Sequence, residues 1–173
     1  MLIRIVKRDD YQSIHDLIVG TYKTNDSGEL LVEKLRQQGD YNCQLEIIAV
    51  EDERIIGHAM LCTAQVEGNQ DDGTVLASIT VSDNVAEEKV GQRLIKALEM
   101  RACAAGYTYI GVLSQADSYL NFGYAPAENY GIATQKTMQN DLLMIKELIT
   151  GALKNVHGKL RFNRAIEEMS VIN

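Results

Sequence analysis

Apolar and polar positions alternate with two different periods along the first forty residues, and these periods predict one strand and two helices. The run LIRIV at 2–6 alternates and is typical of a strand. Over 10–22 the apolar residues recur at helical spacing, and Asp9 or Asp10 can cap this helix. ELLVEKLRQQ at 29–38 predicts a second helix. The apolar residues of the first helix are Ile14, Leu17, Ile18 and Tyr22.

Two apolar runs follow, QLEIIAV at 44–50 and RIIGHAMLCTAQV at 54–66, joined by a charged turn. Such runs predict an antiparallel hairpin. Polar stretches at 23–28 (KTNDSG) and 67–73 (EGNQDDG) predict exposed loops on either side of this region.

The middle of the chain has the pattern of strand, helix and strand. VLASITV at 75–81 has period two, with Val75, Ala77, Ile79 and Val81 on one face. A helix is predicted from Ala86 to about Ala105, and YTYIGVL at 107–113 predicts the next strand. So short a crossover predicts two parallel strands joined in the right-handed sense. The expected apolar stripe of the helix is Val90, Leu94, Ala97, Leu98 and Ala105.

The C-terminal third has weaker patterns: a turn or short helix over 116–124, an irregular stretch, and a strand over 141–149. GKLRFNRAIEEM at 158–169 predicts a last strand that runs into a short helix. No repeat or linker interrupts the pattern, so we expect a single mixed α/β domain over 1–173.

Composition narrows the classes of function. A chain of 173 residues suits one domain, and a net charge of -7 argues against nucleic acid as a partner. No apolar run is long enough for a signal peptide or a membrane span. Three scattered cysteines, without metal-ligand spacing, are expected to be small buried side chains in a cytoplasmic protein. We therefore expect no membrane association and no metal site.

The stretch AEEKVGQRLI, from Ala86 to Ile95, opens the central helix after a strand. Helix N-termini present unpaired amides and partial positive charge, which bind anions, and Lys89, Arg93 and Lys96 add positive charge. A phosphate site and an ordinary amphipathic helix with a single Gly91 both fit these residues.

The segment from SITVS to IGVL resembles the acetyl-CoA-binding core of the GNAT superfamily of N-acetyltransferases, with its loop pattern Q/R-x-x-G-x-G/A. Ala86 stands at the Gln/Arg position, Lys89 at the first glycine and Gly91 at the second. SYLNFGYAPAENYGI resembles the YYxxFGFxPA stretch of the same family, and bacterial predicted acetyltransferases are the most similar subgroup. The resemblance implies a GNAT-like fold, with a central mixed sheet flanked by helices, and acetyl-CoA as co-substrate.

The resemblance also implies site residues. The tyrosine that protonates the leaving thiolate corresponds to Tyr119. Backbone contacts to the pantetheine arm correspond to Ile79, Val81 and Ser82. Contacts to the pyrophosphate correspond to Lys89, Val90, Gly91, Gln92 and Arg93.

The general base stays unassigned, since SITVS has no glutamate; His58 and a water relay to Glu46 are the alternatives. The expected reaction is direct attack of a primary amine, of a small molecule or a protein, on acetyl-CoA. A non-catalytic CoA-binding or regulatory domain of the same fold is the alternative, because the loop pattern is degenerate. Strand edges near the C-terminus favour a homodimer.

Overall fold

The computed structural model describes residues 1–22, 27–69, 72–114, 117–134 and 142–169, and the chain divides into two compact units. The first unit comprises Met1–Cys62 and Ala77–Arg101, and the second comprises Thr63–Leu76 and Ala102–Asn173. Parts of the predicted loops (23–26, 70–71) and single residues of two predicted elements (116, 141) lie outside the described residues. Three elements run through both units: β3 (Arg54–Val66), β4 (Asp72–Val81) and α3 (Glu87–Ala104).

The first unit is built on the predicted hairpin. β1 (Leu2–Ile5) pairs antiparallel with β2 (Glu46–Glu51), which pairs antiparallel with β3. Asp52 and Glu53 form the two-residue turn, both with positive φ (47° and 62°), as a tight hairpin of matching twist requires. The register shifts between Ala49 and Val50, so one residue of β3 bulges out of the ladder.

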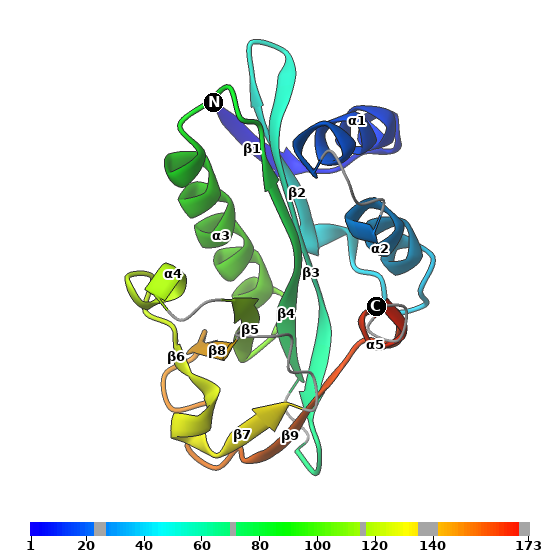
Figure 1. Cartoon of the computed structure of the whole chain (residues 1–173). Helices are drawn as coiled ribbons and strands as arrows, with labels where there is room; N and C mark the ends of the chain where they lie inside the picture. Colours follow the sequence, from blue (N-terminus) through cyan, green and yellow to red (C-terminus); the bar gives the residue numbers. More distant parts are fainter. Residues whose placement is uncertain (23–26, 70–71, 115–116, 135–141, 170–173) are drawn as a thin grey trace. The chain divides into compact units, whose positions relative to one another are not determined.

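Helices cover both faces of the first unit's strands: α1 (Tyr11–Tyr22) and α2 (Ser27–Arg36) lie on one face and α3 on the other (Figure 1). Ile47, Ile48 and Ala49 of β2 are fully buried, as expected of a strand covered on both sides. The helices contribute Ile14, Ile18, Val32, Leu35, Leu94 and Leu98 to the core.

A short 3-10 helix, η1 (Arg8–Asp10), precedes α1 and uses the second of the two candidate capping carboxylates. Asp10 accepts the Lys7 backbone N–H at 2.7 Å and both guanidinium nitrogens of Arg4 at 2.7 and 2.8 Å. The hydrogen bond from Arg4 is the largest influence that holds the pKa of Asp10 below its ordinary value.

The second unit contains the predicted parallel strand pair. Thr74 and Val75 of β4 pair in parallel with Ile110 and Gly111 of β5 (Tyr109–Ser114), which confirms the crossover. β8 (Leu142–Glu147) pairs antiparallel with β5, and the short β6 (Ala125–Pro126) pairs with β8. A Cβ on Gly73 would overlap the Tyr109 ring, so only glycine fits at that position of β4.

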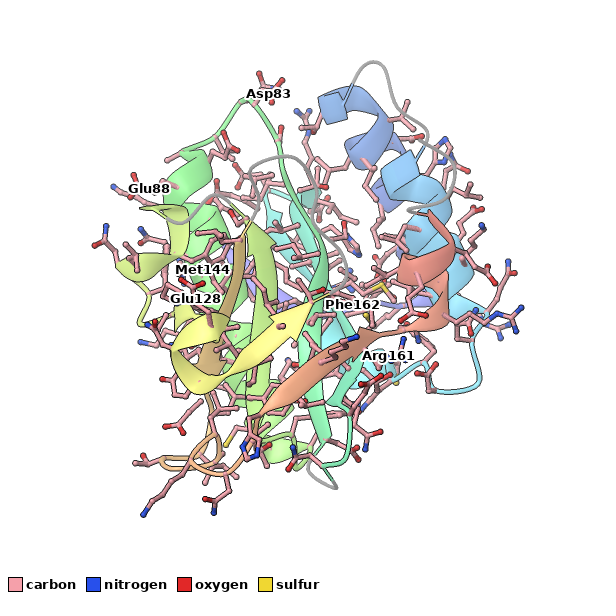
Figure 2. All side chains as sticks on the ribbon, turned by 60° about the horizontal axis from the view of Figure 1, so that its bottom comes forward. Asp83, Glu88, Glu128, Met144, Arg161 and Phe162 are labelled. Carbon is pink, nitrogen blue, oxygen red and sulfur yellow. The ribbon has the colours of Figure 1, made fainter. Side chains whose placement is uncertain are left out.

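At the other edge of this unit, β9 (Gly158–Phe162) pairs antiparallel with the end of β3 and in parallel with β7 (Ile132–Thr134). Phe162 is buried, whereas its neighbour Arg161 is exposed and pairs with Glu67, as alternation along a strand requires (Figure 2). The chain then enters α5 (Arg164–Met169), as predicted.

The nine strands of the described residues form one mixed sheet in the order β1-β2-β3-β4-β5-β8-β6, with β9 pairing with β3 and β7. The predicted mixed α/β fold with a central sheet flanked by helices is therefore confirmed. Three details differ: β4 begins at Asp72, inside the predicted loop; β6 and β7 lie in the stretch predicted to be irregular; and Ala105 follows the end of α3 and is exposed. The expectation of buried cysteines holds for Cys62 and is wrong for Cys43 and Cys103, which are exposed.

Candidate functional site

The first turns of α3 carry most of the predicted cofactor-binding residues. Lys89 and Arg93, four residues apart, are exposed on the helix, whereas Val90 is buried beneath it. Gly91 packs toward the sheet, where an added Cβ would lie 3.9 Å from Ile79 Cδ1. A recess of about 370 Å³ lies at this end of the helix, and its lining includes Ala86, Lys89, Val90, Gln92 and Arg93.

The hydrogen bonds at the start of α3 leave only the amides of its first turn available to a ligand. α3 begins at Glu87, and the Val90 N–H already donates to the Ala86 carbonyl at 3.2 Å. The amides of a helix that have no carbonyl one turn earlier are those of the first residues, here Glu87, Glu88 and Lys89. Of the predicted pyrophosphate contacts, only Lys89 belongs to that first turn.

The C-terminal half of β4 carries the residues predicted for the pantetheine arm. The Ser82 N–H donates to the Ile56 carbonyl at 3.0 Å, and the Ser82 carbonyl accepts from Val85 at 3.3 Å. The backbone groups of Ser82 are therefore already engaged within the first unit. Because successive residues of a strand direct their amides to opposite sides, the backbone groups of Val81 point away from β3.

Tyr119 lies in the second unit, in the one-turn helix α4 (Asp117–Leu120). Its ring packs edge-on against Tyr124 (centroids 5.5 Å apart) and at a tilt against Phe122 (6.0 Å). Lys146 Nζ donates to the Phe122 carbonyl at 2.8 Å and lies 5.5 Å from the Tyr124 ring centroid. Gly123, with φ of 82°, makes the turn that brings these rings together.

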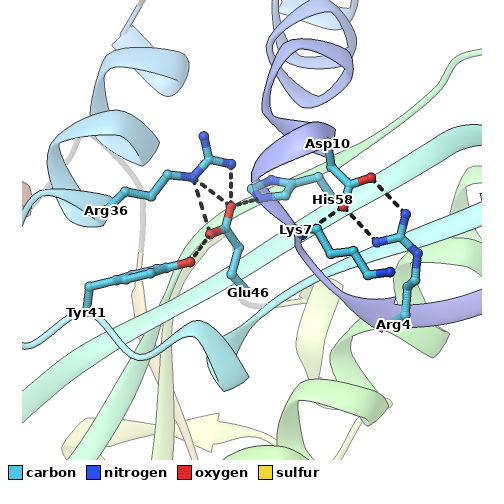
Figure 3. Close-up of polar contacts among 7 residues, drawn as sticks. All are labelled: Arg4, Lys7, Asp10, Arg36, Tyr41, Glu46 and His58. Carbon is cyan, nitrogen blue, oxygen red and sulfur yellow. Dashed lines mark hydrogen bonds and ion pairs between the residues drawn. The ribbon is translucent and has the colours of Figure 1, made fainter.

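A buried polar cluster between the strands and α2 was not anticipated as a unit (Figure 3). Glu46 on β2 is fully buried and accepts hydrogen bonds from three side chains. They are His58 Nε2 on β3 at 2.9 Å, Arg36 on α2 at 2.5 Å from NH2 and 3.1 Å from Nε, and the Tyr41 hydroxyl at 2.6 Å. These four side chains, of Glu46, His58, Arg36 and Tyr41, form the Glu46 cluster.

The charge balance of the Glu46 cluster keeps its carboxylate ionised. Burial alone would raise the pKa of Glu46, but the hydrogen bonds from His58 and Arg36 outweigh it and lower this pKa to about 2. Burial, together with donation to Glu46, raises the pKa of Tyr41, so its hydroxyl stays protonated. The Arg36 guanidinium also lies over the Tyr11 ring of α1, 3.8 Å from its centroid.

The predicted site residues fall into two groups. Ile79, Val81, Ser82 and the α3 residues all belong to the first unit, whereas Tyr119 belongs to the second. The sequence offered one signal for the Glu46 cluster: a glutamate and a histidine inside apolar strands, where a buried charge requires partners. The partners Arg36 and Tyr41 carry no such signal, because each stands among other polar residues.

The described residues contain no grouping of three or more His, Cys, Asp or Glu side chains that could hold a metal ion. None of their helices is long and apolar enough to cross a membrane.

Neither a protein-family model nor a curated protein matches the sequence, whereas solved structures match the fold. A GNAT family N-acetyltransferase (YhbS) from Escherichia coli, in complex with CoA, matches with a TM-score of 0.88 and 21% identity, covering 96% of this chain and 91% of that one. A GNAT family acetyltransferase from Brucella melitensis, with acetyl-CoA, gives 0.76 and 17%, covering 95% and 97%. Aminoglycoside 6'-N-acetyltransferase from Enterococcus faecium gives 0.64 and 19%, covering 86% and 98%. The chain thus has the fold of GNAT N-acetyltransferases.

Proposed function

We propose that this chain, as a single domain over 1–173, is an N-acetyltransferase that transfers the acetyl group of acetyl-CoA to a primary amine. The observation that carries the proposal is the likeness in fold, over nearly the whole chain, to proteins solved with CoA or acetyl-CoA bound. Ala86 and Lys89 depart from the loop pattern of the family, yet α3 and the recess at its N-terminus are both present.

The diphosphate of the cofactor binds at the first turn of α3. The amides of this turn and the exposed side chains of Lys89 and Arg93 supply the positive charge that the diphosphate needs. The pantetheine arm runs along β4 past Ile79 and pairs with the backbone of Val81, whose groups point away from β3. Ser82, Val90 and Gln92 shape the path of the cofactor, whereas Gly91 packs toward the sheet.

The chemistry is a direct transfer without a covalent enzyme intermediate. A neutral amine attacks the thioester carbonyl, the backbone N–H of Val81 polarises that carbonyl, and Tyr119 protonates the departing thiolate. The aromatic contacts of Tyr119 with Phe122 and Tyr124 hold its ring in one orientation. No metal takes part.

The acceptor is the amine of a small molecule or of a protein. Proteins of this fold include an aminoglycoside 6'-N-acetyltransferase and a ribosomal-protein-alanine N-acetyltransferase, which supports both kinds of acceptor. The net charge of -7 favours a cationic amine through electrostatic steering. We place the enzyme in the cytoplasm of a bacterium, as a homodimer, without nucleic-acid or membrane partners.

A non-catalytic CoA-binding or regulatory domain is the second candidate. It is favoured by the two carboxylates, Glu87 and Glu88, in the first turn of α3, because they repel a diphosphate at the amides of that turn. This candidate requires that CoA bind weakly and that no acetyl group be transferred.

Calorimetric titration with acetyl-CoA, followed by acetyl transfer to a panel of amines, separates the two candidates. The enzyme is expected to bind acetyl-CoA and to turn over, and Tyr119→Phe is expected to lower kcat at least about tenfold at unchanged acetyl-CoA affinity. Tyr107→Phe, in the same unit, is the control and should keep full activity. Absence of binding at millimolar acetyl-CoA, or equal turnover in both variants, contradicts the proposal.

A further inference from the structure

The buried polar atoms of the first unit that have no hydrogen-bond partner among the described residues include Nδ1 of His58 and Oγ1 of Thr80. His58 is fully buried and Thr80 is 2% exposed. An unpaired buried polar atom costs roughly 1–3 kcal/mol, so two of them close together require a physical reason.

The two side chains lie on the same face of the sheet. Gly57 faces α3, since an added Cβ would lie 3.0 Å from Leu94 Cδ1, and Ile79 also faces α3, since its Cδ1 would lie 3.9 Å from a Cβ added to Gly91. The next residue along each strand, His58 and Thr80, therefore faces the opposite side. The antiparallel bond from Ser82 N–H to the Ile56 carbonyl sets a register in which His58 and Thr80 stand opposite each other.

Directly opposite residues of an antiparallel pair have Cβ atoms about 4.5–5.5 Å apart. Two polar atoms at that spacing, without a bond between them, are suited to share one water molecule that bonds to both. The pair thus has the chemistry for one small polar guest.

The Glu46 cluster fixes which nitrogen of His58 carries the proton. The carboxylate of Glu46 can only accept a hydrogen bond, so His58 Nε2, 2.9 Å away, must be the donor. In the neutral ring Nδ1 then carries the lone pair and can accept a proton. The same logic, a buried carboxylate that fixes the tautomer of a histidine base, operates in serine proteases.

We propose that His58, held by Glu46, is the proton acceptor of the acetyl transfer, through a water molecule bound between His58 Nδ1 and Thr80 Oγ1. This inference rests on the proposed function. It fills the role of the general base, for which the strand SITVS offers no carboxylate.

The proton and bond changes balance without another reactant. The amine nitrogen forms a bond to the carbonyl carbon, the bond from that carbon to sulfur breaks, and the thiolate takes the proton of Tyr119. The surplus proton of the amine passes to the water, and the water passes a proton to Nδ1. The resulting imidazolium faces Glu46 as its counter-ion and returns the proton through the same water molecule after the products leave.

The ionisable groups around His58 belong to the Glu46 cluster and to α1, while β4 contributes the hydroxyl of Thr80. They are Glu46 on β2, Arg36 on α2 and Tyr41 after α2, while Tyr11 of α1 contacts the Arg36 guanidinium. A groove of about 420 Å³ between α1 and α2 reaches Arg36 and Tyr11, and its lining includes neither Glu46 nor His58. Solvent in this groove therefore meets Arg36 and not the histidine.

A series at Thr80 tests the relay with little change in packing. Thr80→Val removes the hydroxyl and keeps the shape, so we expect kcat to fall at least about tenfold with the KM for acetyl-CoA unchanged. Thr80→Ser restores the hydroxyl and should restore most of kcat. Thr74→Val, which deletes another buried hydroxyl of β4, is the control and should leave kcat and its pH profile unchanged. Equal kcat in Thr80→Val and Thr80→Ser overturns the proposal.

His58→Gln removes the basic nitrogen and keeps an amide that can donate to Glu46. We expect kcat to fall about 100-fold or more, with unchanged acetyl-CoA binding. If this variant does not fold, nitrogen NMR of histidine-labelled wild-type protein tests the relay instead. The relay requires that the neutral His58 ring carry its proton on Nε2 and not on Nδ1. Observation of the opposite tautomer overturns the proposal.

Different results reject the relay and the proposed function. Wild-type binding and turnover with a flat Thr80 series leave the proposed function in place and reject the relay. Absence of acetyl-CoA binding in the wild type rejects both.

Discussion

Replacement of Gly91 by alanine should stabilise the protein. Gly91 is the fifth residue of α3, and the nearest atom to an added Cβ, outside the helix backbone, is Ile79 Cδ1 at 3.9 Å, an ordinary van der Waals contact. A glycine inside a helix costs about 1 kcal/mol relative to alanine. We therefore expect Gly91→Ala to raise the free energy of unfolding by about 1 kcal/mol, and Tm by about 2–4 °C for a chain of this size.

Gly57→Ala is the matched control with the opposite sign. The Cβ added there would lie 3.0 Å from Leu94 Cδ1 and 3.1 Å from Val90 Cγ1, so α3 or the strand must shift. Overpacking of this kind costs about 1–3 kcal/mol. Both variants add one methyl group to the packing between α3 and the sheet, and they differ only in the room that the methyl group finds.

Thermal melts and urea titrations of both variants measure these effects, and a CoA titration accompanies them. The affinity of Gly91→Ala for CoA should equal that of the wild type, because the added methyl group points toward Ile79 and away from the exposed first turn. A lower Tm for Gly91→Ala would show that Gly91 does not lie inside a regular helix and would refute the packing described for α3.

Three further effects can be measured in the same way. The pKa of Glu46 is lowered to about 2 from an ordinary 4.5, so its charge stabilises the fold fully above about pH 4.5. Urea titrations should show that the free energy of unfolding decreases by roughly 3 kcal/mol as the pH falls through 2. Glu46→Gln should lack this decrease. Arg36→Gln leaves that buried carboxylate without its cation and should cost about 3–5 kcal/mol in urea titrations at neutral pH; a loss below 1 kcal/mol would contradict the role assigned to this ion pair. Glu53→Gly relieves a positive φ of 62° in the hairpin turn and should raise Tm by about 2–4 °C; an unchanged Tm would show that the turn is unstrained.

The strand pairings that the sequence predicted are those whose partners lie close along the chain. The β2–β3 hairpin follows from two apolar runs with a short charged turn, and the parallel pairing of β4 and β5 follows from a single helical crossover. The strands β6 and β7 were missed because each is two or three residues long and pairs with a strand that comes later, β8 or β9. Nothing within so short a segment distinguishes it from a loop.

The candidate site shows the same limit. A local pattern located the start of α3, but the exact helix start decides which amides are available, and only the bond from Val90 to the Ala86 carbonyl determines it. Glu46 and His58 are recognisable in the sequence as ionisable residues within apolar strands. Their contact depends on the hairpin register, and the partnership with Arg36 depends on how α2 packs, which no pattern within α2 specifies.

The neighbouring positions of Gly57 and His58 constrain how the length of the hairpin can vary. An insertion of one residue before Gly57 would turn the His58 imidazole toward α3, where the side chains of α3 leave no room for it. Gly57 would then take the place of His58 beside Glu46. Insertions of two residues preserve which side chains face each helix. The bulge next to Val50 is the place where this hairpin already accommodates a single extra residue. Away from this bulge, the strands of viable homologues and designed variants should differ in length by even numbers of residues.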